Sequence, residues 1–132
     1  MKLQVGVKAI LKNSKGLYLL IQRSKPLDGD IKWDIPGGRI GRFDPSERLE
    51  DALNRELREE IGAEPEGPIR LIMAQDIIPP DANLHVVRLT YTARFNKDVI
   101  LSEEHQDFRW VTKEEALRLN IDPYLRKPLE TL

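Results

Sequence analysis

The sequence predicts an α/β (α+β) sandwich in which helices cover a central mixed β-sheet. Three observations support this class: strand-like apolar segments separated by turn signals fill most of the chain, one long helix-forming segment interrupts them, and two capping signals near the end predict short helices. A chain of 132 residues is long enough for one core and too short for two, so we expect a single domain over residues 1–132.

The first two strands are expected to form a hairpin. Apolar residues alternate with others from Leu3 to Leu11, which predicts a strand with one buried face. Asn13 to Gly16 is a turn signal, and the apolar run from Leu17 to Gln22 suits a strand covered on both faces. A polar loop follows at residues 23–30, where Arg23 and Lys25 are placed to meet a phosphate.

The segment from Ile31 to Ile35 contains Trp33 and leads directly into Pro36-Gly37-Gly38. A Trp usually packs in a core or at its rim, but beside a ligand loop it could also stack on a base. Paired glycines allow the backbone to approach a ligand closely. We therefore take Trp33, together with Arg23 and Arg39, as candidate substrate-binding residues.

The longest helix is expected from about Ser46 to Ile61, where neither Pro nor Gly occurs, and Gly62 is placed to end it. On a helical wheel, an apolar stripe is formed by Leu49, Leu53 and Leu57. Three acidic residues lie beside this stripe or on its flank instead of opposite to it: Glu56, Glu59 and Glu60.

These three carboxylates require a counter-charge. Like charges three and four residues apart on a helix repel one another, and a carboxylate that is partly removed from water needs a cation nearby. Clustered carboxylate oxygens suit a hard divalent ion such as Mg²⁺ or Mn²⁺. The alternative is a solvated acidic face balanced by Arg55 and Arg58, but the position of the acids on the wheel favours the metal site.

The second half of the chain predicts further strands and two capped helices. Residues 64–68 read as a linker, and strands are expected at Ile69–Ile78, Leu84–Phe95 and Phe108–Val111. Thr112 and Glu115 resemble a capping box, while Asp122 and Pro123 are typical of a helix start.

The spacing of Gly41, Glu47, Arg55-Glu56-Leu57, Glu59-Glu60 and Gly62-Ala63 resembles the Nudix box of the Nudix hydrolase superfamily. Two departures occur: Ala63 stands where the family usually has an aliphatic residue, and about three extra residues precede Glu47 if the box begins at Gly38, as the Pro-Gly-Gly element indicates. The resemblance covers nearly all of the chain and implies the Nudix α/β/α sandwich with a central mixed sheet.

The resemblance implies a metal-dependent hydrolase. Such an enzyme cleaves a diphosphate bond in a nucleoside diphosphate linked to another moiety, by attack of water at phosphorus, with Mg²⁺ or Mn²⁺. Carried over by position, Glu56 and Glu60 are metal ligands, Glu59 is a third ligand or a base, and Gly38 offers a carbonyl ligand. Among the catalytic candidates, Arg55 and Glu47 are expected to form a charge-assisted pair that orients the carboxylates.

A general base is expected outside the box. Glu104 is the first choice and Glu103 the second, because Glu-Glu-His-x-x-x-x-Trp resembles the segment where many relatives carry a functional Glu. The alternative is a solvated acidic loop. His105 is more often a packing or hydrogen-bonding residue than a base.

The substrate class stays open at this stage. Pro79 lies sixteen residues after Ala63, which resembles ADP-ribose-hydrolysing relatives, whereas the small size resembles the nucleoside-triphosphate branch. A Nudix-like module that senses a nucleotide without cleaving it is the alternative from another class, and the box acids favour an enzyme over it. The absence of Cys counts against an isomerase of isoprenoid diphosphates.

The amino-acid composition limits the classes of binding partner that we expect. The 21 basic and 22 acidic residues nearly cancel, so neither a nucleic-acid polymer nor an anionic membrane is indicated, and a small nucleotide-type substrate is expected. No apolar run approaches the ~20 residues needed to span a bilayer and no signal peptide is evident, so a cytoplasmic protein is expected. A homodimer is possible.

Overall fold

The computed structural model describes residues 1–24 and 31–132, so the loop candidate Lys25 lies outside the described residues. The strands in this part of the chain are β1 (Lys2–Lys12), β2 (Tyr18–Arg23), β3 (Trp33–Asp34), β4 (Gly37–Arg39), β5 (Glu66–Ile77), β6 (Leu84–Arg94) and β7 (His105–Val111), and the helices are α1 (Leu49–Ile61), α2 (Lys113–Arg118) and α3 (Pro123–Glu130). None of the described helices is both long and apolar enough to cross a membrane.

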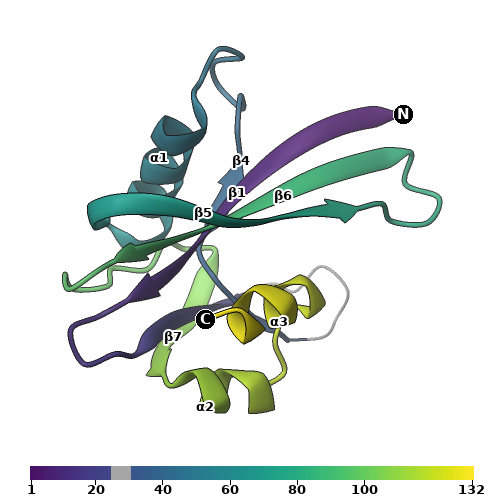
Figure 1. Cartoon of the computed structure of the whole chain (residues 1–132). Coiled ribbons are helices and arrows are strands. Elements are labelled where there is room, and N and C mark those ends of the chain that lie inside the picture. The colour runs from purple at the N-terminus through teal and green to yellow at the C-terminus, as the bar shows by residue number, and fades with distance from the viewer. Residues whose placement is uncertain (25–30) are drawn as a thin grey trace.

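The strands form one mixed sheet, as predicted. β6 runs parallel to β1 along its whole length, and β5 pairs antiparallel with β6. On its other side β1 pairs with β4 through Gly6 to Lys8 and meets β2 at Lys12. β3 and β7 both pair antiparallel with β2 (Figure 1). β1 is therefore the strand through which the two halves of the sheet meet.

Helices cover both faces of this sheet, which confirms the sandwich. α1 lies on one side, and α2 and α3 lie on the other (Figure 1). The first core lies beneath α1, where Leu53, Leu57 and Ile61 are fully buried against β1, β2 and β6. The second core lies beneath α2 and α3, where Leu125 and Leu129 pack against the opposite face.

β1 contributes side chains to both cores. Val7, Ala9 and Leu11 enter the first core, as their alternation predicts, but Ile10 is also buried and enters the second core. The expectation of a single buried face was therefore wrong for the second half of this strand, because α3 and its neighbours cover the face that alternation alone assigns to solvent. The fully covered β2 was predicted correctly: Leu19, Leu20 and Ile21 are all buried.

α1 begins later than the sequence suggests. It starts at Leu49, not Ser46, and its N-cap residue Arg48 makes no side-chain capping bond. Leu49 is 38% exposed and does not belong to the buried stripe. The end of the helix was predicted correctly, because Gly62 adopts the left-handed conformation (φ 88°) and its N–H donates to the carbonyl of Arg58.

The remaining elements largely follow the sequence. The predicted linker at residues 64–68 was wrong, because β5 already begins at Glu66, whose partner on β6 is Arg94. The capping box of α2 is present in full, with Thr112 and Glu115 exchanging both bonds. Asp122 caps α3 by accepting a hydrogen bond from the N–H of Tyr124.

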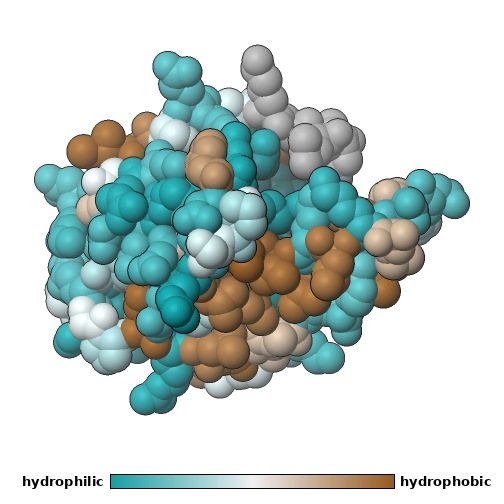
Figure 2. Space-filling model, turned by 90° about the horizontal axis from the view of Figure 1, so that it is seen from above, coloured by the Kyte–Doolittle hydropathy of each residue, from teal (hydrophilic) through white to brown (hydrophobic). Residues whose placement is uncertain are grey.

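Hydrophobic side chains gather in one area of the face seen from above, among hydrophilic ones (Figure 2). Large exposed hydrophobic residues occur at Leu3 on β1, at Leu71 on β5 and at Ile78 just after it. Since no partner chain accompanies the structure, the possible homodimer stays a prediction.

We expect burial along α1 to determine the stability of the fold. Leu53→Ala removes a fully buried side chain and should lower the free energy of unfolding by about 2–5 kcal/mol. The matched variant Leu49→Ala lies one turn earlier at an exposed position and should cost less than about 1 kcal/mol. Urea unfolding followed by circular dichroism measures both, and equal losses would contradict this assignment of the buried face.

Candidate active site

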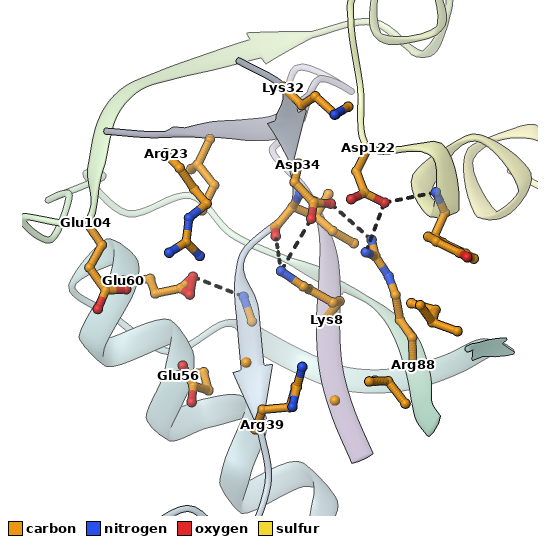
Figure 3. A pocket seen from close by; sticks show the side chains of 18 of the residues that line it. Lys8, Arg23, Lys32, Asp34, Arg39, Glu56, Glu60, Arg88, Glu104 and Asp122 are labelled. Atoms are coloured by element: carbon orange, nitrogen blue, oxygen red, sulfur yellow. Dashed lines mark hydrogen bonds and ion pairs between the residues drawn. The ribbon is translucent and has the colours of Figure 1, made fainter. Parts of the chain in front are cut away.

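A pocket of about 720 Å³ opens where α1, β1, β4, β6 and the start of α3 meet. It contains acidic side chains at one end, basic side chains in the middle, and a buried group of acidic and basic residues at the far end (Figure 3). The residues of the sequence prediction that line it are Gly38, Glu56, Glu60, Arg23, Arg39 and Glu104.

Glu56 is buried against the backbone of Gly38. Only 5% of Glu56 is exposed, and a Cβ at Gly38 would lie 2.4 Å from its carboxylate carbon, so no larger residue fits there. Burial raises the pKa of Glu56, the charge of Glu59 adds to this, and Arg55 opposes it. The second glycine of the Pro-Gly-Gly element is therefore needed because the carboxylate of Glu56 lies close to its backbone.

Glu60 lies one turn further along α1. Its Oε2 accepts a hydrogen bond from the N–H of Gly37 at 3.2 Å. Burial raises the pKa of Glu60 to about 7, with further upward contributions from Glu56 and Asp34, while Lys8 and the N–H of Gly37 act in the opposite direction. Removal from water is therefore the main reason why Glu60 holds its proton more tightly than an exposed glutamate.

Arg55 ties the loop before α1 to the helix. Its Nε and Nη2 donate to the two oxygens of Glu47 at 2.7 and 3.0 Å, so the charge-assisted pair that the sequence suggested is present and is bidentate. Nη2 also donates to the carbonyl of Arg39, and the N–H of Gly41 donates to Glu47. Arg55 and Glu47 do not line the pocket, so the geometry gives them a positioning role.

Glu59 is separated from the main pocket. It lines a smaller pocket of about 270 Å³ together with Glu56, Glu60, Glu103 and Glu104. Arg55 Nη1 donates to Glu56 at 2.9 Å and lies 3.4 Å from both oxygens of Glu59.

The acidic loop after β6 is held close to α1. The N–H of Ser102 donates to the carbonyl of Glu60 at 3.1 Å, and the N–H of Ser24 donates to the carbonyl of Glu104 at 2.8 Å. These bonds bring Glu103 and Glu104 beside the helix acids. His105 lies next to them, and burial lowers its pKa, with Lys8 and Arg23 adding to the effect.

Three basic residues face the middle of the pocket from different strands. Arg23 lies at the end of β2, Lys8 in β1, and Arg39 at the end of β4 (Figure 3). Lys8 Nζ donates to the carbonyl of Ile35 and lies 3.4 Å from Asp34. Phosphate oxygens would find complementary charge here.

Trp33 does not line the pocket. Its side chain packs at the edge of the second core, and the guanidinium of Arg109 lies 5.8 Å from its ring centroid. Its backbone is more informative, because its N–H donates to the carbonyl of Asn120 and its carbonyl accepts from the N–H of Asp122, both at 2.8 Å. Trp33 thereby joins β3 to the start of α3.

The far end of the pocket contains a group that sequence reasoning missed. Arg88 is 5% exposed and donates to Asp34 at 3.0 Å and to Asp122 at 3.3 Å. Burial pushes the pKa of Asp34 upward, but Lys8 and Arg88 hold it below its ordinary value. For Asp122 burial and the charge of Asp34 prevail, and its pKa is raised.

Two of these residues gave a weak signal in the sequence. Arg88 stands between the apolar residues Val87 and Leu89, and Asp34 lies two residues before the Pro-Gly-Gly element. Asp122 was recognised, but only as a helix cap. Lys8 was assigned to the uncovered side of β1, where no pocket could be foreseen.

The donor set at the acidic end suits a hard divalent cation. Glu56 is buried and Glu60 half-buried, the pKa values of both carboxylates are raised, and a cation would favour their ionised forms. As the side chains stand, Arg55 provides the counter-charge of Glu56, and no three Asp, Glu or His side chains among residues 1–24 and 31–132 converge on one point.

A mixed sheet between helices, with two glutamates of one helix beside a cationic pocket, suits a hydrolase that acts on phosphate anhydrides. The family model of the NUDIX domain matches residues 2–132. The chain belongs to the NUDIX family, and it is an enzyme of the Nudix pyrophosphohydrolase type. Nudix hydrolases generally need a divalent metal and act on small nucleotides.

Individual relatives agree with this assignment. Nucleoside triphosphatase NudI of Escherichia fergusonii is 29% identical, with 74% of each chain covered. The crystal structure of the MutT protein from Methanosarcina mazei Go1 gives a TM-score of 0.83 at 28% identity, covering 98% of this chain and 92% of that one. The solution structure of the E. coli ORF135 protein gives a TM-score of 0.81 at 28% identity, covering 98% and 88%.

The pair formed by Arg55 and Glu47 should stabilise the loop measurably. In a double-mutant cycle with Arg55→Lys and Glu47→Gln, we expect a coupling free energy of about 1 kcal/mol, because both side chains are mostly buried and the pair is bidentate. The exposed pair of Arg58 on α1 and Glu64 just after this helix serves as control and should couple by at most ~0.5 kcal/mol. A coupling free energy no larger than that of the control pair would contradict the positioning role of Arg55 and Glu47.

The raised pKa of Glu60 predicts a pH dependence of stability in metal-free protein. The folded state keeps a proton that the unfolded state, with an ordinary value of 4.5, has lost. The stabilising contribution is therefore complete below about pH 4.5 and is lost as the pH rises through about 7. Thermal unfolding with chelator should show the melting temperature of wild type falling more steeply over this range than that of Glu60→Gln. Parallel curves would show that Glu60 titrates normally.

Proposed function

We infer that this enzyme is a divalent-metal-dependent pyrophosphohydrolase of nucleoside triphosphates. One observation carries the proposal: the buried carboxylate of Glu56 and the half-buried carboxylate of Glu60 lie at the end of a pocket whose next section is lined by Lys8, Arg23 and Arg39. A chain of phosphates fits this order of charges, with one part beside the carboxylates and the other beside the basic side chains. The name of the relative NudI, a nucleoside triphosphatase, supports the same substrate class.

The proposed reaction is hydrolysis of one phosphoanhydride bond. A water oxygen attacks phosphorus, the bond from that phosphorus to the bridging oxygen breaks, and the bridging oxygen leaves with the other product. Glu104, in the pocket beside Glu60, is the proposed acceptor of the water proton, and Glu59 is the alternative on α1. Arg23 and Arg39 hold the phosphate oxygens during the attack.

A bound Mg²⁺ or Mn²⁺ would neutralise charge on the diphosphate and make water a better nucleophile near neutral pH. Glu56 and Glu60 are its proposed ligands, with Glu59 and the carbonyl of Gly38 as further candidates. Arg55 fixes the position of Glu56 through its hydrogen bond, and Glu47 holds Arg55 in turn.

ADP-ribose is retained as a second substrate candidate because of Pro79. This residue lines the pocket between β5 and β6, so the position that suggested ADP-ribose from sequence spacing faces the ligand space. A screen of (d)NTPs, ADP-ribose, nucleotide sugars and dinucleoside polyphosphates separates the two classes. The reaction products are treated with a phosphatase or a diphosphatase, and the phosphate that is released is measured. Turnover of ADP-ribose without turnover of any nucleoside triphosphate would replace the first proposal by the second.

The carboxylates of α1 should be essential to turnover. Glu56→Gln and Glu60→Gln each replace a charged oxygen ligand by a neutral amide, so kcat/KM with Mg²⁺ should fall by about 100-fold or more. Glu50→Gln makes the same change at an exposed position of the same helix and should leave the rate near that of wild type. Unchanged metal-dependent turnover in the first two variants would overturn the proposed mechanism.

A further inference from the structure

The loop between β4 and α1, which is longer than the Nudix pattern, contains an exposed aromatic residue between two arginines. Phe43 is 69% exposed. The guanidinium of Arg55 lies 5.3 Å from the centroid of its ring, and that of Arg42 lies 5.1 Å from it. A cation over an aromatic ring is attracted by the negative face of the ring. Since Glu47 holds Arg55, the ring of Phe43 connects Arg42 to a side chain that is fixed on α1.

Hydrogen bonds within the loop define the course of its backbone. The side chain of Asp44 accepts from the N–H and the hydroxyl of Ser46 at 2.9 and 2.8 Å, and its carbonyl accepts from the N–H of Glu47 at 3.0 Å. The N–H of Gly41 donates to Glu47 Oε1 at 3.3 Å. Arg42 lies between these anchored points, so its position on the loop is set by local turns.

Arg42 lies where the two pockets of the site meet. It lines the main pocket together with Glu56, Glu60 and Glu104, and it also lines the smaller pocket. Among the described residues around the smaller pocket, Arg42 is the one basic residue, and the others are five glutamates and Ser102. Burial raises the pKa of Glu56, and the charge of Arg42 acts against this rise, so the guanidinium lies close enough to influence that carboxylate.

Arg42 is nevertheless not the fixed partner of these glutamates. It forms no ion pair within the described part of the chain, whereas Arg55 forms ion pairs with Glu47, Glu56 and Glu59. A guanidinium whose face rests on a ring keeps its N–H donors along its edge. Those donors are available for a planar, bidentate contact with an anion.

The order of charges along the main pocket indicates which anion would reach Arg42. A phosphate chain held by Arg23 and Arg39 in the middle of the pocket extends toward Glu56 and Glu60, the end that Arg42 lines (Figure 3). In the proposed reaction water attacks phosphorus at this end, and negative charge spreads over the oxygens of the phosphoryl group. A guanidinium beside these oxygens stabilises the charge that develops there.

We propose that Arg42 is a further catalytic residue, which donates hydrogen bonds to oxygens of the phosphoryl group that water attacks, and that Phe43 is the positioning residue that holds it there. The inference rests on the proposed hydrolysis of a phosphoanhydride bond. Arg42 adds a third arginine to Arg23 and Arg39, and it comes from the lengthened loop, whereas the other two lie at the ends of strands.

Steady-state kinetics with a nucleoside triphosphate at saturating Mg²⁺ test the role of Arg42. Arg42→Gln should lower kcat by about 10-fold or more, because its donors act on charge that develops during the attack. Arg42→Lys should recover only part of the rate, since an ammonium group cannot make the bidentate contact. Arg48→Gln makes the same change at an exposed position of the same loop and should keep the kcat of wild type.

The role of Phe43 is tested by one variant that removes the aromatic ring and one that keeps it. Phe43→Leu should lower kcat in the same direction as Arg42→Gln, whereas Phe43→Tyr should retain the rate of wild type because its ring still supports the guanidinium. Equal losses of kcat in the two variants, with unchanged melting temperatures, would overturn the positioning role.

Binding of methylenediphosphonate with Mg²⁺ provides a readout without turnover, because its P–C–P bridge is not hydrolysed. Calorimetry should show roughly fivefold weaker binding to Arg42→Gln than to wild type, and wild-type affinity in Arg48→Gln. If the protein hydrolyses no nucleoside triphosphate, the proposed reaction fails and this comparison alone decides the role of Arg42. Weaker binding to Arg42→Gln then supports the phosphate contact, and equal binding overturns it.

The kinetic outcomes are equally decisive if turnover is found. A kcat of Arg42→Gln equal to that of wild type, whether or not KM rises, overturns the catalytic role and leaves the proposed reaction standing. A loss of kcat that disappears when more Mg²⁺ is added would mean that Arg42 acts through the glutamates, and it also overturns the proposal. A loss that persists at every Mg²⁺ concentration and is absent from Arg48→Gln supports it.

Discussion

The burial of two carboxylates between α1 and β4 is the constraint on which the rest of the site depends. Glu56 and Glu60 give up solvation by water, and their raised pKa values express that cost. Two hydrogen bonds offset part of this desolvation cost: Arg55 donates to Glu56, and the N–H of Gly37 donates to Glu60. The glycines of β4 follow from the same constraint, because side chains there would collide with Glu56 or with β1.

Arg55 connects this buried charge to the loop that precedes the helix. It contacts Glu47 through two hydrogen bonds and the carbonyl of Arg39 through a third. Glu47 in turn accepts from the N–H of Gly41, which has a positive φ of 68°. The loop is longer than the family pattern suggests, yet it is anchored at both ends, so its length need not disturb the carboxylates.

The parts of the site that could be predicted from sequence are those encoded within a few turns of chain. The acids of α1 and the pair of Arg55 with Glu47 are local, so helical periodicity and motif spacing were enough to find them. Arg88 and Asp34 are 54 positions apart and meet because β1 pairs both with β6 and with β4, which follows Asp34 closely in the chain. A charged residue within a strand is ordinarily assigned to solvent, and its burial becomes evident only when its partners are known. The predicted start of α1 was wrong for a related reason: no side chain caps this helix, so no local signal marks where it begins.

The charges of the pocket are arranged differently in its two parts. Its middle has Arg23 and Arg39, whose positive charge is complementary to phosphate. At its far end, Arg88 pairs with Asp34 and Asp122, and Lys8 lies 3.4 Å from Asp34, so these charges largely compensate one another. Because Asp122 is fixed by the start of α3 and by the backbone of Trp33, that geometry belongs to the framework of the sandwich. The compensation of charge at the far end therefore depends on how β3, β6 and α3 are packed together, and rearranging a surface loop would leave it in place.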